Sequence, residues 1–521
     1  MKKSTRIVLS IVIGTLLTAL AYYIVLPPLN VFSPGFWTFL LFVVAFYGVP
    51  LGVSTAVPAQ KKGQPSFKVS KVFIIVAAVP VAVLVIGGIV SSTFFNAQKY
   101  AAVIEVQQSD FSEDMPEADV VTNISLMDTA SASILGNREL GALSDVVSQY
   151  NVSADYNQIN YKGTPKKVAN LEYVDFFRWL NNSANGVPGY VMVDPVGNDA
   201  DYVKFEKPMI YVDSAYLEED LMRKLRFSYP TKIFSSVNFE VDEEGNPYYI
   251  VSCMKPRVGL FGAMDVSEVI IFNPCDGTSE IYPVSESPAW IDNVYDGTLA
   301  CQKYDWYGTL SRGFWNSVIG KRDCKMTTQG YGYVVRGDDV WYYTGVTSVT
   351  SDESNIGFIL TNARTGEYKY YPIIGAEEYS AMGAAQGEVQ EKGYVASFPS
   401  LINVEGQATY IMVLKDENGL VKLYALVNVE NYSIVATGDS QASAKQAYLE
   451  ELAKRGVITE EELPAPETKT ADLTVKTVRL ATVGGETVVY LTAEDGTVYR
   501  GSVPIGDMAG TLAAIRRHGI R

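Results

Sequence analysis

The chain has 521 residues, of which 48% are hydrophobic and 12% aromatic, a composition typical of a membrane segment joined to a well-packed globular part. Eight of its 42 Lys and Arg residues and none of its 58 Asp and Glu residues lie in the first 100 positions, so the remainder carries 34 basic and 58 acidic residues. Because contacts with phosphate require clustered Lys and Arg, this acidic balance excludes nucleic acid as a partner.

The usage of histidine and cysteine removes several classes of catalyst. The single histidine, His518, is among the last four residues, whereas Ser-His-Asp, Cys-His and zinc-protease sites need one inside the fold. The cysteines lie more than twenty residues apart and form no CxxC pair, which argues against zinc or an iron-sulfur cluster. They are Cys253, Cys275, Cys301 and Cys324. We therefore assign no catalytic, cofactor-binding or metal-binding residue, and expect no cofactor.

Three apolar stretches at the beginning of the chain predict three transmembrane helices, at about 7–26, 36–57 and 72–95. Each is long enough to cross a hydrocarbon core of about 30 Å at about 1.5 Å per residue. Basic residues occur before the first stretch and between the second and the third, whereas the link 27–35 is uncharged. By the positive-inside rule the N-terminus is cytoplasmic, and everything after residue 96 is extracytoplasmic.

A cleaved signal peptide at residues 1–21 is the alternative for the first stretch. Lys2 and Lys3, an apolar core and the Ala19-Leu20-Ala21 sequence have the required form. The apolar run continues through Leu26, which favours a membrane span. Because no Asp, Glu, His, Lys or Arg lies inside any predicted span, we expect these helices to anchor the chain rather than to transport a solute.

Residues 99–231 mix strand and helix patterns and predict an N-terminal α+β region outside the membrane. An amphipathic segment at about 168–181 carries several aromatic residues, which we expect to lie in a core. Strands are expected at 189–193 and 209–212. A helix is expected at 216–227, because its acidic residues come early and its basic residues late, as the helix dipole favours.

A threefold repeat of a helix followed by a small antiparallel sheet is predicted at 232–456. Glycine turns open aromatic strands with one spacing, in the pairs Gly245 and Tyr249, Gly337 and Trp341, and Gly406 and Tyr410. A later strand of each unit ends at an asparagine, namely Asn273, Asn362 and Asn428. We expect the aromatic residues of the central copy to pack between units rather than to form a binding face. Cys301 and Cys324 flank one connection between repeats and are the favoured disulfide pair.

The C-terminal part of the chain predicts one more helix and a small β domain. The helix follows Gly438, is capped by Asp439 or Ser440 and ends at Gly456. An acidic linker at 460–467 contains proline, and strand patterns after it predict a β domain at 468–521. The predicted fold class is therefore α+β, with three N-terminal transmembrane helices, extracytoplasmic helix-and-sheet repeats and this domain.

Residues 357–367, GFILTNARTGE, resemble the strand, turn and strand of PepSY-type modules, in which a strand ends in a D-A-x-T-G-E-like turn. Asn362 stands in place of the usual acid. Residues 410–416, YIMVLKD, are similar to the strand that precedes that turn. The stretch 341–436 also resembles large membrane-anchored proteins of Gram-positive bacteria. The PepSY resemblance implies that the repeats bind or regulate another exported protein, such as a peptidase or a cell-wall enzyme.

The sequence thus predicts a non-enzymatic, membrane-anchored binding or regulatory scaffold of the cell envelope. Its expected partners are the lipid bilayer and another envelope protein or cell-wall component. The alternative is a membrane-held glycan hydrolase, because a pair of carboxylates hydrolyses a glycan without histidine. A deep acidic groove would favour the hydrolase, whereas an exposed aromatic sheet face or a free strand edge would favour binding.

Overall fold

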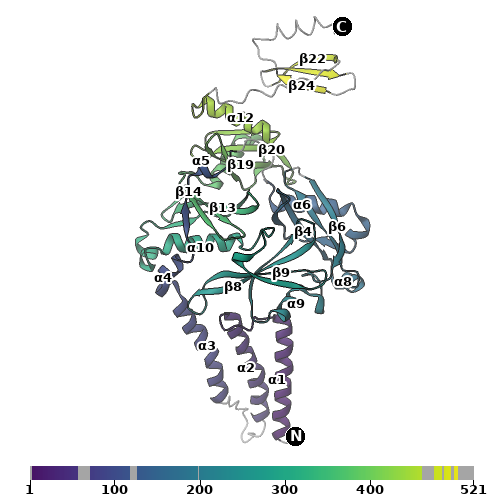
Figure 1. Cartoon of the computed structure of the whole chain (residues 1–521), viewed down its shortest axis with the longest axis vertical. Coiled ribbons are helices and arrows are strands. Elements are labelled where there is room, and N and C mark those ends of the chain that lie inside the picture. The colour runs from purple at the N-terminus through teal and green to yellow at the C-terminus, as the bar shows by residue number, and fades with distance from the viewer. Residues whose placement is uncertain are drawn as a thin grey trace. The chain divides into compact units, whose positions relative to one another are not determined.

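The computed structural model describes residues 3–56, 71–117, 126–196, 199–459, 475–483, 486–493 and 498–502. It divides the chain into two compact units, Met1–Thr459 and Glu460–Arg521. The architecture is α+β, and mainly antiparallel sheets form most of the first unit after its N-terminal helices (Figure 1).

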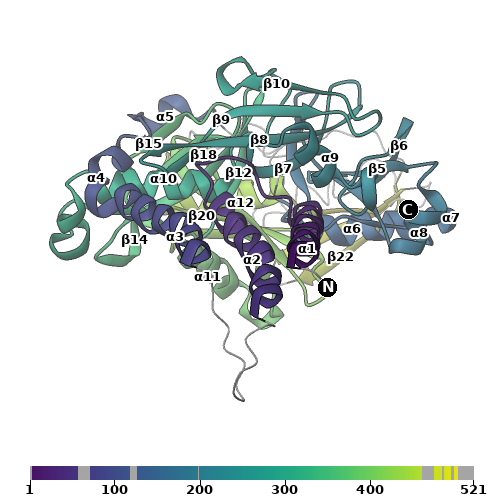
Figure 2. The ribbon, with the colours of Figure 1, turned by 90° about the horizontal axis from the view of Figure 1, so that it is seen from below.

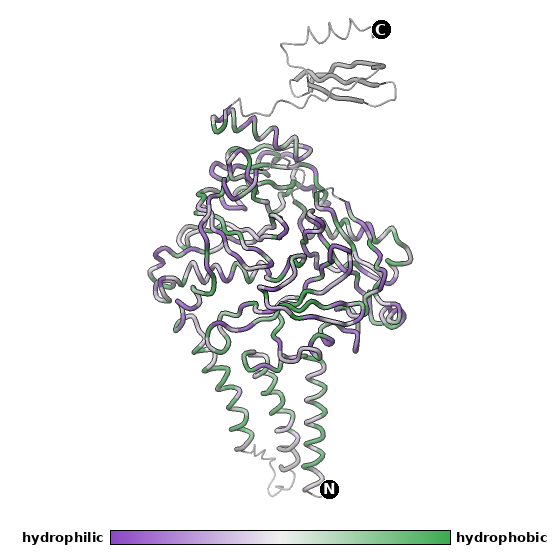
Figure 3. The backbone as a smooth tube through the Cα atoms, viewed as in Figure 1, coloured by the Kyte–Doolittle hydropathy of each residue, from purple (hydrophilic) through white to green (hydrophobic). Residues whose placement is uncertain are grey.

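Three helices precede the sheets: α1 (Lys3–Val25), α2 (Pro34–Ala56) and α3 (Lys71–Ser91). Among the described residues, two stretches are long and apolar enough to cross a membrane, Ile7–Val25 in α1 and Phe73–Ser91 in α3 (Figure 3). The described apolar part of α2, Pro34–Pro50, is shorter. At about 1.5 Å per residue it reaches about 26 Å, less than a hydrocarbon core of about 30 Å. The expectation of three spans is corrected to two candidate spans and one shorter apolar helix.

Four antiparallel sheets of one plan follow along the first unit, each a meander of four consecutive strands. Sheet I contains β3 (Asn157–Tyr161), β4 (Thr164–Tyr173), β5 (Val187–Asp194) and β6 (Asp199–Met209). Sheet II contains β7 (Ile233–Val241), β8 (Pro247–Val258), β9 (Gly262–Phe272) and β10 (Ser279–Pro283). Sheet III contains β12 (Gly332–Arg336), β13 (Asp339–Ser348), β14 (Ser351–Asn362) and β15 (Tyr368–Tyr371). Sheet IV contains β18 (Ser400–Val404), β19 (Gln407–Lys415), β20 (Val421–Asn428) and β21 (Val435–Gly438).

Five short strands extend these sheets. They are β2 (Tyr150–Val152) on β4, β1 (Val106–Gln108) in parallel on β15, β11 (Lys325–Thr327) on β13, β16 (Gly375–Ala376) on β14 and β17 (Val395–Ala396) on β19. The parallel pairing of β1 joins the segment that leaves the N-terminal helices to sheet III.

The same turn chemistry recurs in all four sheets. The first hairpin turns on a glycine with positive φ, at Gly163 (76°), Gly245 (86°), Gly337 (62°) and Gly406 (71°), a conformation that glycine adopts without strain. At the third hairpin a side-chain oxygen of Asp194, Asn273, Asn362 or Asn428 accepts a hydrogen bond from a backbone N–H two or three residues on. The three predicted copies share this plan, and the structure adds a fourth, sheet I, inside the predicted N-terminal α+β region.

Helices lie before, between and after the sheets. In chain order the longer ones are α4 (Thr93–Ala101), α6 (Thr129–Gly141), α9 (Leu221–Ser228), α10 (Gly297–Leu310), α11 (Glu378–Glu388) and α12 (Gln441–Lys454). The shorter ones are α5 (Phe111–Asp114), α7 (Ser144–Val147), α8 (Phe176–Asn182), η2 (Leu217–Glu219), η3 (Val284–Glu286), η4 (Asn316–Gly320) and η5 (Gln390–Lys392). Ser440 caps α12, as predicted, by accepting from the Ser443 N–H.

The four sheets lie around a common centre, and neighbours are joined by hydrogen bonds or ion pairs (Figure 1). The joining pairs are Asn157 with the Phe239 carbonyl, the Val294 N–H after sheet II with the Ala363 carbonyl next to β14, Asn355 with Tyr410, and Lys415 with Asp128, which caps α6 before sheet I. Sheets I and II share one hydrophobic core, and sheets III and IV share another. Six aromatic residues of β13 and β15 in sheet III are buried, as the packing interpretation predicts: Trp341, Tyr342, Tyr343, Tyr368, Tyr370 and Tyr371.

Two local expectations are wrong. The segment 168–181 is not one amphipathic helix, because β4 continues to Tyr173 and only α8 is helical. The Gly163 turn pairs β3 with β4, and this pairing overrides the helical spacing. Of the aromatic side chains on α8 only Trp179 is buried, whereas Phe176 and Phe177 are exposed. All four cysteines are free thiols, so the expected Cys301–Cys324 disulfide is absent.

The second unit contains an antiparallel sheet in the order β22 (Val475–Val483), β23 (Glu486–Ala493) and β24 (Val498–Ser502). These strands lie within residues 468–521, for which the sequence predicts a small β domain. The acidic linker 460–467 lies outside the described residues.

Candidate ligand-binding cavity

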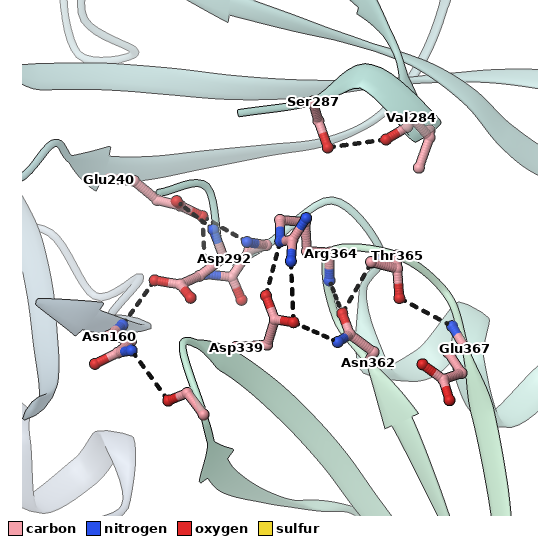
Figure 4. A network of polar contacts seen from close by, with 12 residues as sticks. Asn160, Glu240, Val284, Ser287, Asp292, Asp339, Asn362, Arg364, Thr365 and Glu367 are labelled. Atoms are coloured by element: carbon pink, nitrogen blue, oxygen red, sulfur yellow. Dashed lines mark hydrogen bonds and ion pairs between the residues drawn. The ribbon is translucent and has the colours of Figure 1, made fainter. Parts of the chain in front are cut away.

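Two carboxylates meet at the junction of sheets I, II and III (Figure 4). Glu240, at the end of β7, accepts hydrogen bonds of 2.8 to 2.9 Å from the Asp292 N–H, the Asn293 N–H and the Asn293 side chain. Asp292 accepts from the Asn160 N–H at 2.7 Å, and Tyr342 of sheet III donates to the Tyr295 carbonyl in the same connection. The carboxylates thus hold the connection after sheet II against its two neighbours.

This pair is suited to structure rather than to hydrolysis. Burial raises the pKa of Glu240 to about 7, and burial together with Glu240 raises the pKa of Asp292. Glu240 is 0% and Asp292 2% exposed, so no substrate reaches either group. Protein N–H groups donate to both oxygens of Glu240 and to one oxygen of Asp292, and these bonds offset part of the cost of burying the carboxyls.

A separate cavity of about 310 Å³ lies between sheets I and II. Its lining is largely polar and includes Ser153, Asp155, Asn170, Asp213, Ser236 and Tyr249. None of the side chains that line it is a Lys, Arg or His. Its volume is near the lower end of the range of about 300 to 1,000 Å³ that is usual for small-molecule sites.

Backbone features of both sheets place these side chains. Tyr249 lies on β8, opposite Phe239 of β7, in the core shared by the two sheets. Ser236 lies in the stretch of β7 where the pairing with β8 shifts register, and such bulges turn a side chain toward a site. Asp213 follows Val212, which bridges Asp220, and precedes Ser214, whose hydroxyl accepts from the Tyr173 N–H. The Asp213 loop is therefore fixed on both sides.

Negative charge dominates the cavity. Desolvation by the surrounding protein atoms raises the pKa of Asp213 to about 6. Repulsion from the Asp220, Glu172 and Asp155 carboxylates adds to this shift. Asp213 is exposed to solvent, which weakens the contribution of desolvation to this pKa shift. The contribution of repulsion between the carboxylates remains. A positive charge in the cavity would relieve this repulsion.

Three buried hydroxyls of residues that line the cavity lack hydrogen-bond partners among the residues that the structure describes, those of Tyr156, Ser236 and Tyr249. Tyr249 is 2% exposed and its hydroxyl is unpaired, as is the buried hydroxyl of Ser236. Burial raises the pKa of Tyr249, and so do the nearby Asp213 and Glu172 carboxylates, which places its ring on the acidic side of the cavity. An unpaired buried hydroxyl costs about 1 to 3 kcal/mol, and a bound polar ligand would remove that cost.

The geometry suits an organic cation better than a metal ion. Within the described ranges, no three or more His, Cys, Asp or Glu side chains are grouped so as to hold a metal. A primary ammonium group donates three hydrogen bonds and carries one positive charge. It matches a cavity lined by Asp213 and Asp155 and by Tyr249 and Ser236, whose buried hydroxyls are unpaired.

The sequence alone does not predict that any of these residues belongs to a binding site. Asp213 and Tyr249 are separated by 36 positions and belong to different segments, and neither lies in a motif. The only signal was the aromatic position after Gly245, which identified Tyr249 as part of a repeat and not as a cavity residue.

Comparisons with known proteins give little further guidance. No family model matches the chain, and no curated protein matches it. Among solved structures, an ancestral GH74 enzyme aligns at 9% identity with a TM-score of 0.15, over 68% of this chain and 42% of that one. The WD40 domain of SCAP from fission yeast aligns at 8% identity with a TM-score of 0.12, over 68% of this chain and 66% of that one. These likenesses are too slight to indicate a fold or a function.

Proposed function

We propose that this protein is a membrane-anchored binding protein of the cell envelope, whose first unit binds a small ammonium-bearing ligand, or such a group on a partner or cell-wall component, in the cavity between sheets I and II. The single observation that carries this proposal is the unpaired, buried hydroxyl of Tyr249, which lines an acidic cavity without basic side chains. The N-terminal helices supply the anchor.

Contacts at the helix ends support this anchor. The Leu29 N–H donates to the Pro230 carbonyl at 2.7 Å, just after α1 and just before sheet II. The Leu260 and Phe261 N–H groups, in the β8–β9 hairpin, donate to the Ser91 hydroxyl at the end of α3. Because α1 and α3 both end at sheet II, spans formed by them would leave the bilayer on the same side.

The direction of insertion follows from charge. In the sequence, basic residues at 2–6 precede the apolar stretch of α1 and basic residues at 61–71 precede that of α3, so the positive-inside rule makes the beginnings of these helices cytoplasmic and the sheets extracytoplasmic. This topology requires the connection between α1 and α3, which contains the shorter apolar helix α2, to return to the cytoplasmic side. The packing of α1 on α2, in which the Thr15 and Tyr47 hydroxyls lie 2.9 Å apart, favours a retained helix over a cleaved signal peptide.

Two experiments test the proposal. Protease added to intact, wall-stripped cells should digest the sheets, and their survival until lysis would contradict the topology. For binding, the full chain in nanodiscs should be stabilised against heat by ethanolamine but not by its uncharged N-acetyl derivative, because a ligand that binds only the folded state raises its stability. Equal effects of the two compounds would contradict recognition of an ammonium group.

A second candidate, glycan hydrolysis, is favoured by one observation. Asp213 has a pKa raised to about 6 and shares the cavity with Asp155, and a raised acid beside a second carboxylate is the arrangement of glycosidases. Release of reducing sugar from cell-wall glycan that Asp213→Asn abolishes would support it. An inactive wild-type chain that still binds ethanolamine would leave binding as the function.

A further inference from the structure

An exposed apolar segment lies beside the end of α3. After α10 the chain runs through residues 312–322, which we name the Trp315 segment and which includes η4. Three of its apolar side chains face solvent, with exposed fractions of 63% for Trp315, 52% for Val318 and 73% for Ile319. Exposed apolar patches of this kind mark a surface that is covered by a membrane or by another protein.

Aromatic contacts attach this segment to the candidate span. Phe94 follows α3 by three residues, and its ring centroid lies 5.0 Å from that of Phe314 and 5.8 Å from that of Trp315. Phe95 is 64% exposed and stacks edge-on with Phe94. Because Phe94 follows the end of α3 by only three residues, the patch lies near the end of that helix, at the depth of the headgroups if α3 spans the bilayer.

Charge at the same place agrees with a lipid surface. Lys321 and Arg322 are exposed and follow Ile319 after one glycine, Gly320. Aromatic and aliphatic side chains next to Lys and Arg are typical of segments that lie in the membrane interface.

A matching patch flanks the other candidate span. Phe177 of α8 and Leu217 of η2 are 66% and 58% exposed. Arg223 of α9 donates to the Leu217 carbonyl and lies over the Tyr23 ring near the end of α1, 4.2 Å from its centroid. Seen from below, α4 and α8 lie on opposite sides of the three helices (Figure 2).

We propose that the Trp315 segment inserts into the headgroup region of the bilayer that α3 crosses, with Trp315, Val318 and Ile319 in the apolar boundary and Lys321 and Arg322 at the phosphates. The α8 patch rests on the same surface. Together the two contacts hold sheet II against the membrane and fix the tilt of the sheets. This inference rests on the proposed membrane anchor.

The test places a fluorescent thiol label on Ile319→Cys and on Phe177→Cys in the full chain, reconstituted into vesicles that contain anionic lipid. The matched control is Tyr432→Cys, since Tyr432 is 54% exposed in the turn between β20 and β21 of sheet IV. The parent chain, labelled in parallel, corrects for its own cysteines.

We expect lipid-attached nitroxide to quench the labels at Ile319 and Phe177, and water-soluble iodide to quench the label at Tyr432. Quenching of the Ile319 label by iodide alone, in a chain that sodium carbonate does not extract, would overturn the membrane contact and leave the anchor in place. Protection of that label from both quenchers would indicate a protein partner and would also overturn it. Extraction of the chain by carbonate would overturn the anchor itself.

Discussion

Lys167 in β4 and Tyr249 in β8 occupy the same position in two sheets of one plan, because each is the fourth residue after the glycine of the first hairpin. Trp341 and Tyr410 hold that position in sheets III and IV. All four side chains are buried, so in sheet I a lysine occupies a core position. Its ammonium lies 5.1 Å from the centroid of the Tyr333 ring.

Replacing this lysine should stabilise the protein at neutral pH. Burial lowers the pKa of Lys167 from the usual 10.5 to about 8, although the Asp128 carboxylate offsets part of the effect. Below pH 8 the folded state holds a buried charge, and between about pH 8 and 10.5 the unfolded state binds more protons, so stability rises with pH in that window. We predict that Lys167→Met raises stability at pH 7 by about 3 kcal/mol.

Thermal unfolding of the full chain at pH 7 and pH 10.5 checks this prediction. The gain should shrink toward zero at the higher pH, where the wild-type lysine is neutral. Lys204→Met, at an exposed position of β6, serves as the control. A destabilised Lys167→Met variant at pH 7 would contradict the prediction.

Removal of the hydroxyl should change the stability of the protein in opposite directions at two tyrosines that occupy equivalent positions, Tyr249 and Tyr410. The Tyr249 hydroxyl has no partner among the described residues, so Tyr249→Phe should raise stability by about 1 kcal/mol and weaken binding in the cavity. The Tyr410 hydroxyl donates to the Ala376 carbonyl and accepts from Asn355. Tyr410→Phe should therefore cost about 1 kcal/mol and leave binding unchanged. Chemical denaturation and ligand titration of both variants test this contrast.

Binding of a cation in the cavity should weaken as the pH falls. The pKa of Asp213 is raised to about 6, so its carboxylate is protonated in most molecules at pH 5. We predict a loss of affinity of about tenfold between pH 7.5 and pH 5, from the fraction ionised. The Asp213→Asn variant should show a flat profile, and a wild-type profile as flat as that of the variant would contradict the assigned role.

The stability of the protein should require the Glu240 carboxylate as a hydrogen-bond acceptor. Asp292 and Asn293 direct N–H groups at it, and an amide would turn its own N–H₂ toward one of these donors. Glu240→Gln is expected to cost about 2 kcal/mol, measured by denaturation. Glu244→Gln, in the exposed turn before β8, is the control, and equal stability of the two variants would show that the junction tolerates the mismatch.

How much of the fold can be predicted from the sequence depends on the local chemistry of each element. The turn glycines and the closing asparagines are local signals, and they located sheets II, III and IV. Sheet I was not predicted, because Lys167 stands at the position of the aromatic residue of the other sheets and Asp194 at the position of their asparagine. The cavity could not be predicted from the sequence for another reason. Asp213 and Tyr249 are brought together only by the packing of two sheets, and no spacing along the chain indicates that they are close.

The most direct test of the proposed function is calorimetric titration of ethanolamine into the full chain in nanodiscs at pH 7.5. The wild type and an Asp201→Asn control, altered at an exposed position of β6, should bind with equal affinity. Asp213→Asn should lose most of that affinity, and N-acetylethanolamine should bind to none of the three. Unchanged affinity of Asp213→Asn, or equal binding of the acetylated compound to the wild type, would contradict an ammonium-binding cavity.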